Sequence, residues 1–71
     1  MNYRYYTYDY ITSEAHYYFG FDDLKNYLDL YLRRLNEENF RLGENYRYEL
    51  NHEEDAYEIC DAINIELVKL I

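Results

Sequence analysis

Residues 51–71, NHEEDAYEICDAINIELVKLI, carry the longest consistent pattern in the chain. At about 100° per residue, most apolar residues of this stretch fall on one arc of a helix. Asn51 is a suitable N-cap, and Glu54 three residues later completes the pattern of a capping box. The stretch therefore predicts one amphipathic helix, whose buried arc consists of Ile59, Cys60, Ile63, Leu67, Leu70 and Ile71.

The opposite side of this predicted helix is acidic. Glu54, Glu58 and Asp61 recur at intervals of four and three residues, so they form one stripe. No Lys or Arg lies between Tyr48 and Val68. Like charges at this spacing destabilise a helix by about 0.2–0.5 kcal/mol per pair. The stripe is therefore either a solvated surface or a surface that binds another molecule.

Length and charge restrict the function further. The 71 residues carry a formal net charge of −8 and include 12 tyrosines. This length fits one domain over residues 1–71 and is too short to enclose a large active site. The negative charge disfavours direct binding of nucleic acid or of an anionic membrane and favours a basic partner. Because no apolar run approaches a membrane span and no signal peptide is recognisable, we expect a soluble, cytoplasmic protein.

The sequence contains no recognisable catalytic or metal-binding pattern. Cys60, the single cysteine, lies on the predicted apolar arc, which indicates a buried structural thiol in a reducing compartment. Gly20 and Gly43 are isolated and do not form a phosphate-binding loop. His16 has no partner at ligand spacing, and the acidic residues after His52 suit the start of a helix. We expect no catalytic residue, no metal, no cofactor and no enzymatic activity.

The N-terminal stretch has the pattern of a hairpin. Residues 2–11, NYRYYTYDYI, are aromatic and β-branched and alternate like a strand with tyrosines on both sides. Tyr6 and Tyr8 share one of these sides. Residues 12–14 form the expected turn, and residues 15–19 the second strand. One side of the first strand can pack on helices, whereas the other must be solvated or covered by a partner.

The middle of the chain predicts a second helix and a third strand. Apolar residues recur at helical spacing from Phe21 to about Asn36. For residues 37–45 we prefer a continuation of this helix to a C′ glycine at Gly43. The alternative is a helix that ends near Asn36, followed by a segment that pairs with the next strand. Residues 46–50, YRYEL, alternate like a half-buried strand. The order ββαβα predicts an α+β fold, a three-stranded antiparallel sheet with two helices on one face.

In overall character, the chain resembles the small inhibitors that phages and other mobile elements encode against host defence. The shared features are small size, strong acidity, an amino-acid composition rich in Asn, Tyr, Glu, Ile and Leu, and the lack of a catalytic motif. Anti-CRISPR proteins, anti-restriction proteins and uracil-DNA glycosylase inhibitors belong to this group, and several of them are DNA mimics. The resemblance implies a viral inhibitor that acts in the host cell cytoplasm, and it assigns no role to an individual residue.

We therefore predict a non-enzymatic inhibitor that binds a basic nucleic-acid-handling protein, such as a CRISPR effector or nuclease, and blocks its nucleic-acid site. Carboxylates about 5–6 Å apart on a helix approach the spacing of backbone phosphates, and tyrosine rings offer stacking planes as bases do. Acidic residues would attract the partner and tyrosines would anchor it. The predicted partner-binding residues are Glu53, Glu54, Asp55, Glu58, Asp61, Ile65, Tyr6 and Tyr8.

An interaction module of a different class is the alternative. An acidic antitoxin would fit the same composition, as would a regulatory subunit that forms a homodimer through its tyrosine face. The two hypotheses differ in their response to salt, because an electrostatic interface weakens as ionic strength rises and an aromatic one does not.

Overall fold

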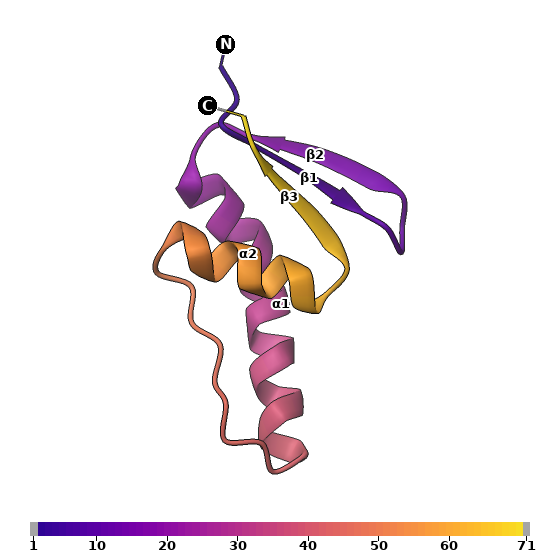
Figure 1. Cartoon of the computed structure of the whole chain (residues 1–71), viewed down its shortest axis with the longest axis vertical. Coiled ribbons are helices and arrows are strands. Elements are labelled where there is room, and N and C mark those ends of the chain that lie inside the picture. The colour runs from indigo at the N-terminus through magenta and orange to yellow at the C-terminus, as the bar shows by residue number, and fades with distance from the viewer. Residues whose placement is uncertain (1, 71) are drawn as a thin grey trace.

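The computed structural model describes residues 2–70 and contains two helices and a three-stranded antiparallel sheet (Figure 1). The α+β class is thus confirmed. Strand β1 is central and pairs with β2 on one side and β3 on the other. The chain order is ββααβ, so the predicted order ββαβα is wrong. The elements are β1 (Tyr5–Asp9), β2 (Glu14–Tyr18), α1 (Phe21–Arg41), α2 (Glu53–Ala62) and β3 (Ile65–Lys69).

The predicted helix over residues 51–71 is wrong in its second half, because α2 ends at Ala62 and β3 follows. Asn64 adopts a left-handed conformation with φ 59°, which asparagine tolerates better than most residues. The chain reverses here, and β3 then pairs antiparallel with the free edge of β1. In β3 the side chains of Ile65 and Leu67 are buried and that of Glu66 is exposed, which is the period of a strand. Ile71 lies outside the described residues.

Residues 46–50 do not form the predicted strand. No helix or strand is present between the end of α1 and the start of α2. Instead, the side-chain amide of Asn36 donates to the Tyr48 carbonyl at 3.0 Å, and its oxygen accepts from the Tyr48 N–H at 2.7 Å. Asn39 donates to the Tyr46 carbonyl at 3.3 Å. Polar side chains of α1 therefore satisfy backbone groups that a neighbouring strand would have satisfied.

The preferred continuation of the first helix is confirmed, since α1 runs to Arg41 with Leu42 as its C-cap. Gly43 follows with φ 79°, a conformation that glycine adopts without steric cost. Its N–H donates to the Phe40 carbonyl at 3.2 Å, and the Glu44 N–H donates to the Asn39 carbonyl at 2.8 Å. This is the Schellman arrangement of a helix end. The second half of α1 projects beyond the sheet, and the molecule measures 44 × 25 × 15 Å (Figure 1).

The predicted hairpin is confirmed. Strand β1 is shorter at both ends than the predicted strand over residues 2–11, whereas β2 has the predicted length but begins and ends one residue earlier, so Glu14 belongs to β2 and not to the turn. Its turn depends on Asp9, whose carboxylate accepts hydrogen bonds from the N–H groups of Ile11 at 2.8 Å and Thr12 at 3.3 Å. Ser13 completes the reversal with φ 62°. The turn thus satisfies the buried Asp9 side chain and sets the register in which Tyr6 faces Tyr17 on β2.

The core joins one side of the sheet to residues of both helices. Along β1, Tyr5, Thr7 and Asp9 are buried, whereas Tyr6 and Tyr8 are only half-buried. The Thr7 and Tyr18 hydroxyls share a buried hydrogen bond of 2.9 Å. The apolar core contains Tyr5, Tyr18, Leu24, Leu28, Leu50, Ala56, Ile59, Cys60, Ile65 and Leu67.

Cys60 is buried, as predicted, and burial raises the pKa of its thiol to about 12. The thiol is therefore protonated and unreactive near neutral pH. None of the helices within residues 2–70 is both long enough and apolar enough to cross a membrane.

Candidate protein-binding surfaces

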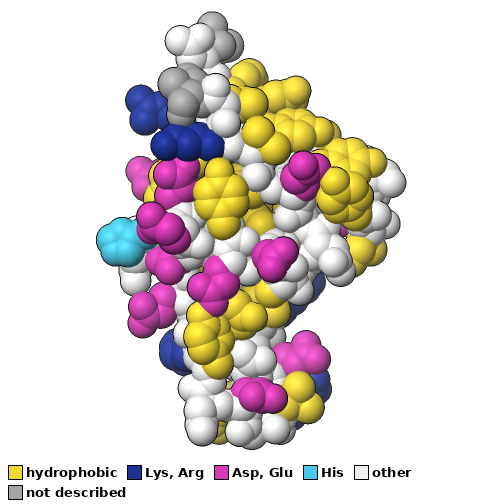
Figure 2. Space-filling model, viewed as in Figure 1, with side chains coloured by type: hydrophobic (Ala, Val, Ile, Leu, Met, Phe, Trp, Pro, Cys, Tyr) yellow, Lys and Arg dark blue, Asp and Glu magenta, His cyan; other side chains and the backbone are white. Residues whose placement is uncertain are grey.

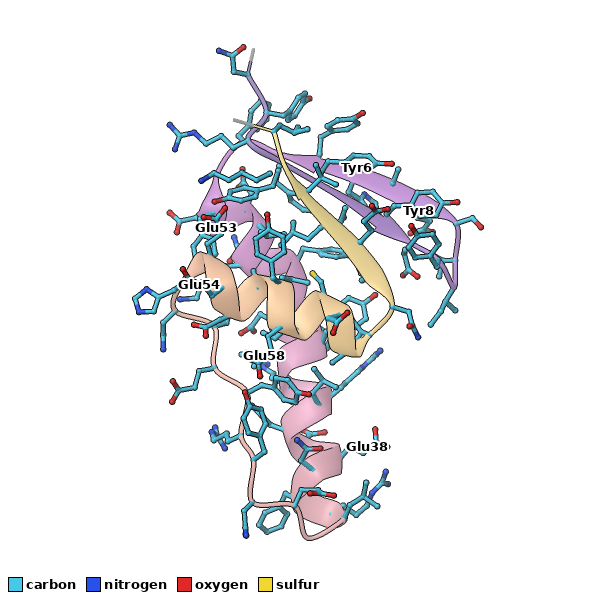
Figure 3. All side chains as sticks on the ribbon, in the orientation of Figure 1. Tyr6, Tyr8, Glu38, Glu53, Glu54 and Glu58 are labelled. Atoms are coloured by element: carbon cyan, nitrogen blue, oxygen red, sulfur yellow. The ribbon has the colours of Figure 1, made fainter. Side chains whose placement is uncertain are left out.

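The structure brings five of the eight predicted partner-binding residues together on α2. We call these five residues, Glu53, Glu54, Asp55, Glu58 and Asp61, the acidic surface. Glu54, Glu58 and Asp61 are exposed, and Glu53 and Asp55 are half-buried. Figure 2 shows Asp and Glu side chains gathered over α2, and Figure 3 shows Glu53, Glu54 and Glu58 along this helix.

Most of the acidic surface has no cationic neighbour. Among residues 2–70, the carboxylates of Glu54, Glu58 and Asp61 form no ion pair within 4.0 Å. Glu53 alone contacts a cation, Lys69, at 3.4 Å. Glu58 accepts a hydrogen bond from the hydroxyl of Tyr46, which is exposed. The acidic surface therefore keeps most of its negative charge available to another molecule.

Asp55 has a structural role in addition to its charge. Its carboxylate accepts hydrogen bonds from the N–H groups of Asn51 and His52, both at 2.9 Å. These bonds lower the pKa of Asp55 because they favour the ionised carboxylate. The N-cap of α2 is His52, so the predicted cap, with Asn51 and Glu54, is wrong by one residue. Asp55 takes the place expected for Glu54 and orders the start of α2.

We expect Asp55→Asn to lower the melting temperature at pH 7, with the difference disappearing in acid. The pKa of Asp55 is lower in the folded chain than its ordinary value of 3.8. The carboxylate therefore contributes stability that is present above pH 3.8 and is lost as pH falls through the lower folded pKa. Thermal melts followed by circular dichroism between pH 7 and pH 2 test this.

Asp61→Asn is the matched control for this prediction. It removes an exposed carboxylate of the same helix that accepts no hydrogen bond from the backbone within the described part of the chain. We expect its melting temperature to equal that of the wild type at pH 7. A difference for Asp55→Asn that persists at pH 2 would contradict the assigned role of the ionised carboxylate.

Ile65 does not belong to the acidic surface. The helical pattern places it beside Glu54, Glu58 and Asp61, but it lies in β3 and is buried in the core. The error arises because the chain changes from helical to strand period after Ala62, and this change turns Ile65 inward. Exposed Tyr57 and Tyr46 instead supply aromatic area next to the acidic residues.

Tyr6 and Tyr8 lie apart from the acidic surface. They project from β1 on the side opposite to the buried Tyr5 and Thr7 (Figure 3). Because antiparallel partners share a side of the sheet, Tyr17 and Val68 lie beside Tyr6. The eight predicted binding residues therefore separate into three groups: the five residues of the acidic surface, the core residue Ile65, and the pair Tyr6 and Tyr8 on the opposite side of the sheet.

The side of the sheet that carries Tyr6 and Tyr8 has further aromatic residues that sequence analysis did not identify as binding residues. The rings form a row in which Phe19 stacks on Tyr3 at 4.5 Å, Tyr3 lies 5.2 Å from Tyr17, and Tyr17 lies 5.0 Å from Tyr6. A second ring pair, Tyr8 and Tyr10, has a centroid distance of 5.1 Å. The alternation of side chains in the second strand could have indicated that Tyr17 is exposed. Its position beside Tyr6, however, depends on the register between the two strands. We call Tyr3, Tyr6, Tyr8, Tyr10, Tyr17 and Phe19 the tyrosine face.

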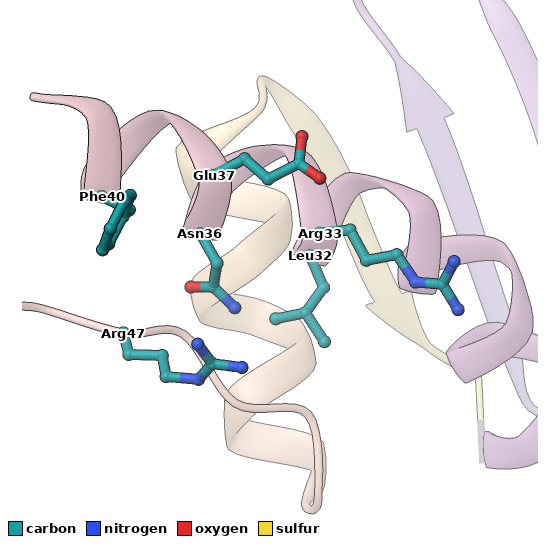
Figure 4. A pocket seen from close by; sticks show the side chains of 6 residues that line it. All are labelled: Leu32, Arg33, Asn36, Glu37, Phe40 and Arg47. Carbon is teal, nitrogen blue, oxygen red and sulfur yellow. The ribbon is translucent and has the colours of Figure 1, made fainter.

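An open groove lies between the second half of α1 and the segment that follows it. Figure 4 shows its lining, which consists of Leu32, Arg33, Asn36, Glu37, Phe40 and Arg47. The Asn36 side chain holds the backbone of Tyr48, and Arg33 pairs with Asp29 at 3.0 Å. The polar groups of Asn36 and Arg33 in the groove are thus already bonded to other groups of the protein. Residues 2–70 contain no group of three or more His, Cys, Asp or Glu side chains that could hold a metal ion.

Comparison with known proteins finds no matching family model, no matching curated protein and no matching solved structure.

Proposed function

We propose that this chain is a non-enzymatic inhibitor, of viral origin, that binds a basic nucleic-acid-handling protein through its acidic surface. The target is a protein such as a CRISPR effector or a nuclease, and the inhibitor blocks its nucleic-acid site. The observation that carries the proposal is the exposure of Glu54, Glu58 and Asp61 on one helix, without a cationic neighbour in the described residues.

The acidic surface is held in place before binding. Ala56, Ile59 and Cys60 anchor α2 in the core, and Asp55 orders its first turn. The carboxylates are therefore presented without the cost of ordering the helix on binding. A groove lined with Lys and Arg binds nucleic acid through its phosphates. The same groove attracts a row of fixed carboxylates, which then excludes the nucleic acid.

Aromatic residues beside the carboxylates add contact area. Tyr57 lies on α2, and Tyr46 bonds to Glu58 from the preceding segment. Tyrosine is enriched at the centres of protein interfaces because it buries a rigid ring and keeps a polar hydroxyl. The acidic surface thus combines charge, which accelerates association, with rings that slow dissociation.

The test is a charge reversal with a matched control. Glu54→Lys, Glu58→Lys and Asp61→Lys are combined in one variant, and Glu37→Lys, Glu38→Lys and Glu44→Lys in the other. Each substitution adds two charges, so both variants change the net charge from −8 by +6 to −2. The control carboxylates are exposed and lie in the second half of α1 or just after it, where Figure 3 shows Glu38 far from α2.

Affinity capture from bacterial lysate, with identification by mass, supplies the binding measurement. We expect the wild type and the control variant to retain the same basic protein, and duplex DNA to displace it. The α2 variant should bind this purified protein at least ~100-fold more weakly, because three attractive contacts become repulsive. Equal binding by both variants and the wild type would contradict the proposal. So would equal loss in both variants, since net charge alone would then explain it.

A further inference from the structure

We propose that the tyrosine face is a homodimer interface, covered by the tyrosine face of a second copy of this chain. It lies on the side of β1 away from the core, and its side chains are not among the core residues. This inference goes beyond the proposed function, because it concerns a different surface and a different partner.

The exposed area of the tyrosine face supports a partner. Tyr10 is 61% exposed, Tyr17 57%, Phe19 48% and Tyr3 38%. At about 200 Å² for each ring residue, these four leave roughly 400 Å² exposed, before the half-buried Tyr6 and Tyr8 are added. Monomers rarely expose a continuous apolar patch beyond about 300–600 Å². A stable interface buries about 800 Å² per partner. The tyrosine face thus falls within the range of the largest apolar patch of a typical monomer, which is often functional, and below the area of a standard interface, so it suits a dimer of modest affinity.

The charge distribution favours a second copy as the occupant. The chain has 15 Asp and Glu residues against 7 Lys and Arg residues. Glu66 on β3 lies beside Tyr8, and its carboxylate accepts a hydrogen bond of 2.6 Å from the Tyr10 hydroxyl. None of the six residues of the tyrosine face is charged at neutral pH. Two copies can therefore meet here without placing like charges at the centre, whereas a basic partner finds many more carboxylates on α2.

The position of Glu66 is compatible with two-fold symmetry. It belongs to the edge strand β3, whereas Tyr6 and Tyr8 belong to the central strand β1. A two-fold axis that runs parallel to β1, between the tyrosine faces of the two copies, makes the interface self-complementary and places the two Glu66 side chains on opposite sides of it. The rows of rings on the two copies can then stack on each other, and the tyrosine hydroxyls remain free to bond at the rim.

The dimer would present two acidic surfaces. Ile65 and Leu67 of β3 face the core together with α2 residues, so the acidic surface and the tyrosine face belong to different sides of the sheet. Dimerisation therefore leaves both copies of α2 free to bind a target, and a target with two basic sites would be bound more tightly.

Sedimentation velocity at 1–100 μM chain, in 50 and 500 mM NaCl, measures the association. We expect a species of twice 8.9 kDa whose fraction rises with salt, because salt screens the repulsion between two chains of charge −8. This salt response is opposite to that of binding through the acidic surface. The two proposals therefore fail independently.

Matched variants locate the interface. Tyr17→Glu and Tyr57→Glu each add one negative charge at an exposed tyrosine, the first on the tyrosine face and the second on α2. We expect Tyr17→Glu to raise the dimer dissociation constant at least ~30-fold and Tyr57→Glu to change it less than ~3-fold. Circular dichroism melts establish that both variants are folded.

Three results would overturn the homodimer. The first is a monomer at every salt and chain concentration. The second is a dimer that Tyr57→Glu weakens as much as Tyr17→Glu does. The third is a monomeric wild type that captures a target which Tyr17→Glu fails to capture, because the tyrosine face would then belong to that target.

Discussion

Leu28→Ala is expected to destabilise the protein by about 3–5 kcal/mol, enough to unfold a large fraction of the molecules at 25 °C. Leu28 is 0% exposed and belongs to the core. Truncation removes its transfer free energy and leaves a cavity, and Leu→Ala changes in cores cost about 2–5 kcal/mol. A core of this size supplies only about 3–5 kcal/mol of net stability, so the substitution removes most of it.

Urea denaturation followed by circular dichroism tests this, with Leu30→Ala as the control. Leu30 lies on the same helix and is 53% exposed, so the identical substitution should change stability by no more than about 0.5 kcal/mol. The ratio of the two effects measures how strongly one side of α1 is buried. If both variants unfold at the same urea concentration as the wild type, Leu28 does not pack in the core.

Ile65→Asp is expected to prevent folding, with a cost of at least ~4 kcal/mol. Ile65 is 5% exposed and lies opposite the buried Asp9 on β1. A carboxylate here would lose its hydration and would face a second carboxylate, and both effects disfavour the folded state. If residue 65 were instead on the surface of a longer helix, the change would cost about 0.5 kcal/mol or less.

Ile11→Asp is the matched control for this prediction. Ile11 is 74% exposed and lies in the turn after Asp9, so the same substitution should leave the fold intact. Circular dichroism and the dispersion of amide proton signals distinguish a folded from an unfolded variant. A folded Ile65→Asp variant with the stability of the wild type would contradict the existence of β3.

Those elements whose signals are local could be predicted from the sequence. The helix α1 has its apolar residues at helical spacing and ends two residues before Gly43, where a positive φ is required. The hairpin has alternating residues on both sides of a short turn that contains Thr12 and Ser13. The acidic surface was also predictable, because its five residues lie on one short helix. In each case the residues that determine the structure are neighbours in the chain.

The stretch after Ala62 could not be assigned in this way, because it fits two periods. Ile63, Leu67 and Leu70 fit the spacing of a helix, whereas Ile65 and Leu67 fit that of a strand. The free edge of β1 lies more than 50 residues away in sequence, and its backbone groups are satisfied by pairing with β3. This long-range pairing, together with the left-handed conformation of Asn64, favours a strand over a helix for the residues after Ala62.

The segment at residues 46–50 has the pattern of a strand but does not form one. Its alternation fits a strand, but both edges of β1 are occupied, by β2 and β3. The side chains of Asn36 and Asn39 bind its backbone instead. A backbone segment with strand-like residues therefore remains irregular when a polar side chain, rather than a strand, offers the hydrogen-bond partners.

By itself, the sequence determined the α+β class, the first helix with its end, the hairpin, the buried thiol of Cys60 and the clustering of acidic residues on α2. Tertiary structure alone decided that Ile65 is a core residue and that Tyr6 and Tyr8 lie on a different side of the sheet from the acidic surface. Helix spacing, caps and turns act between residues a few positions apart, whereas the face to which a strand residue points depends on the distant strand with which it pairs.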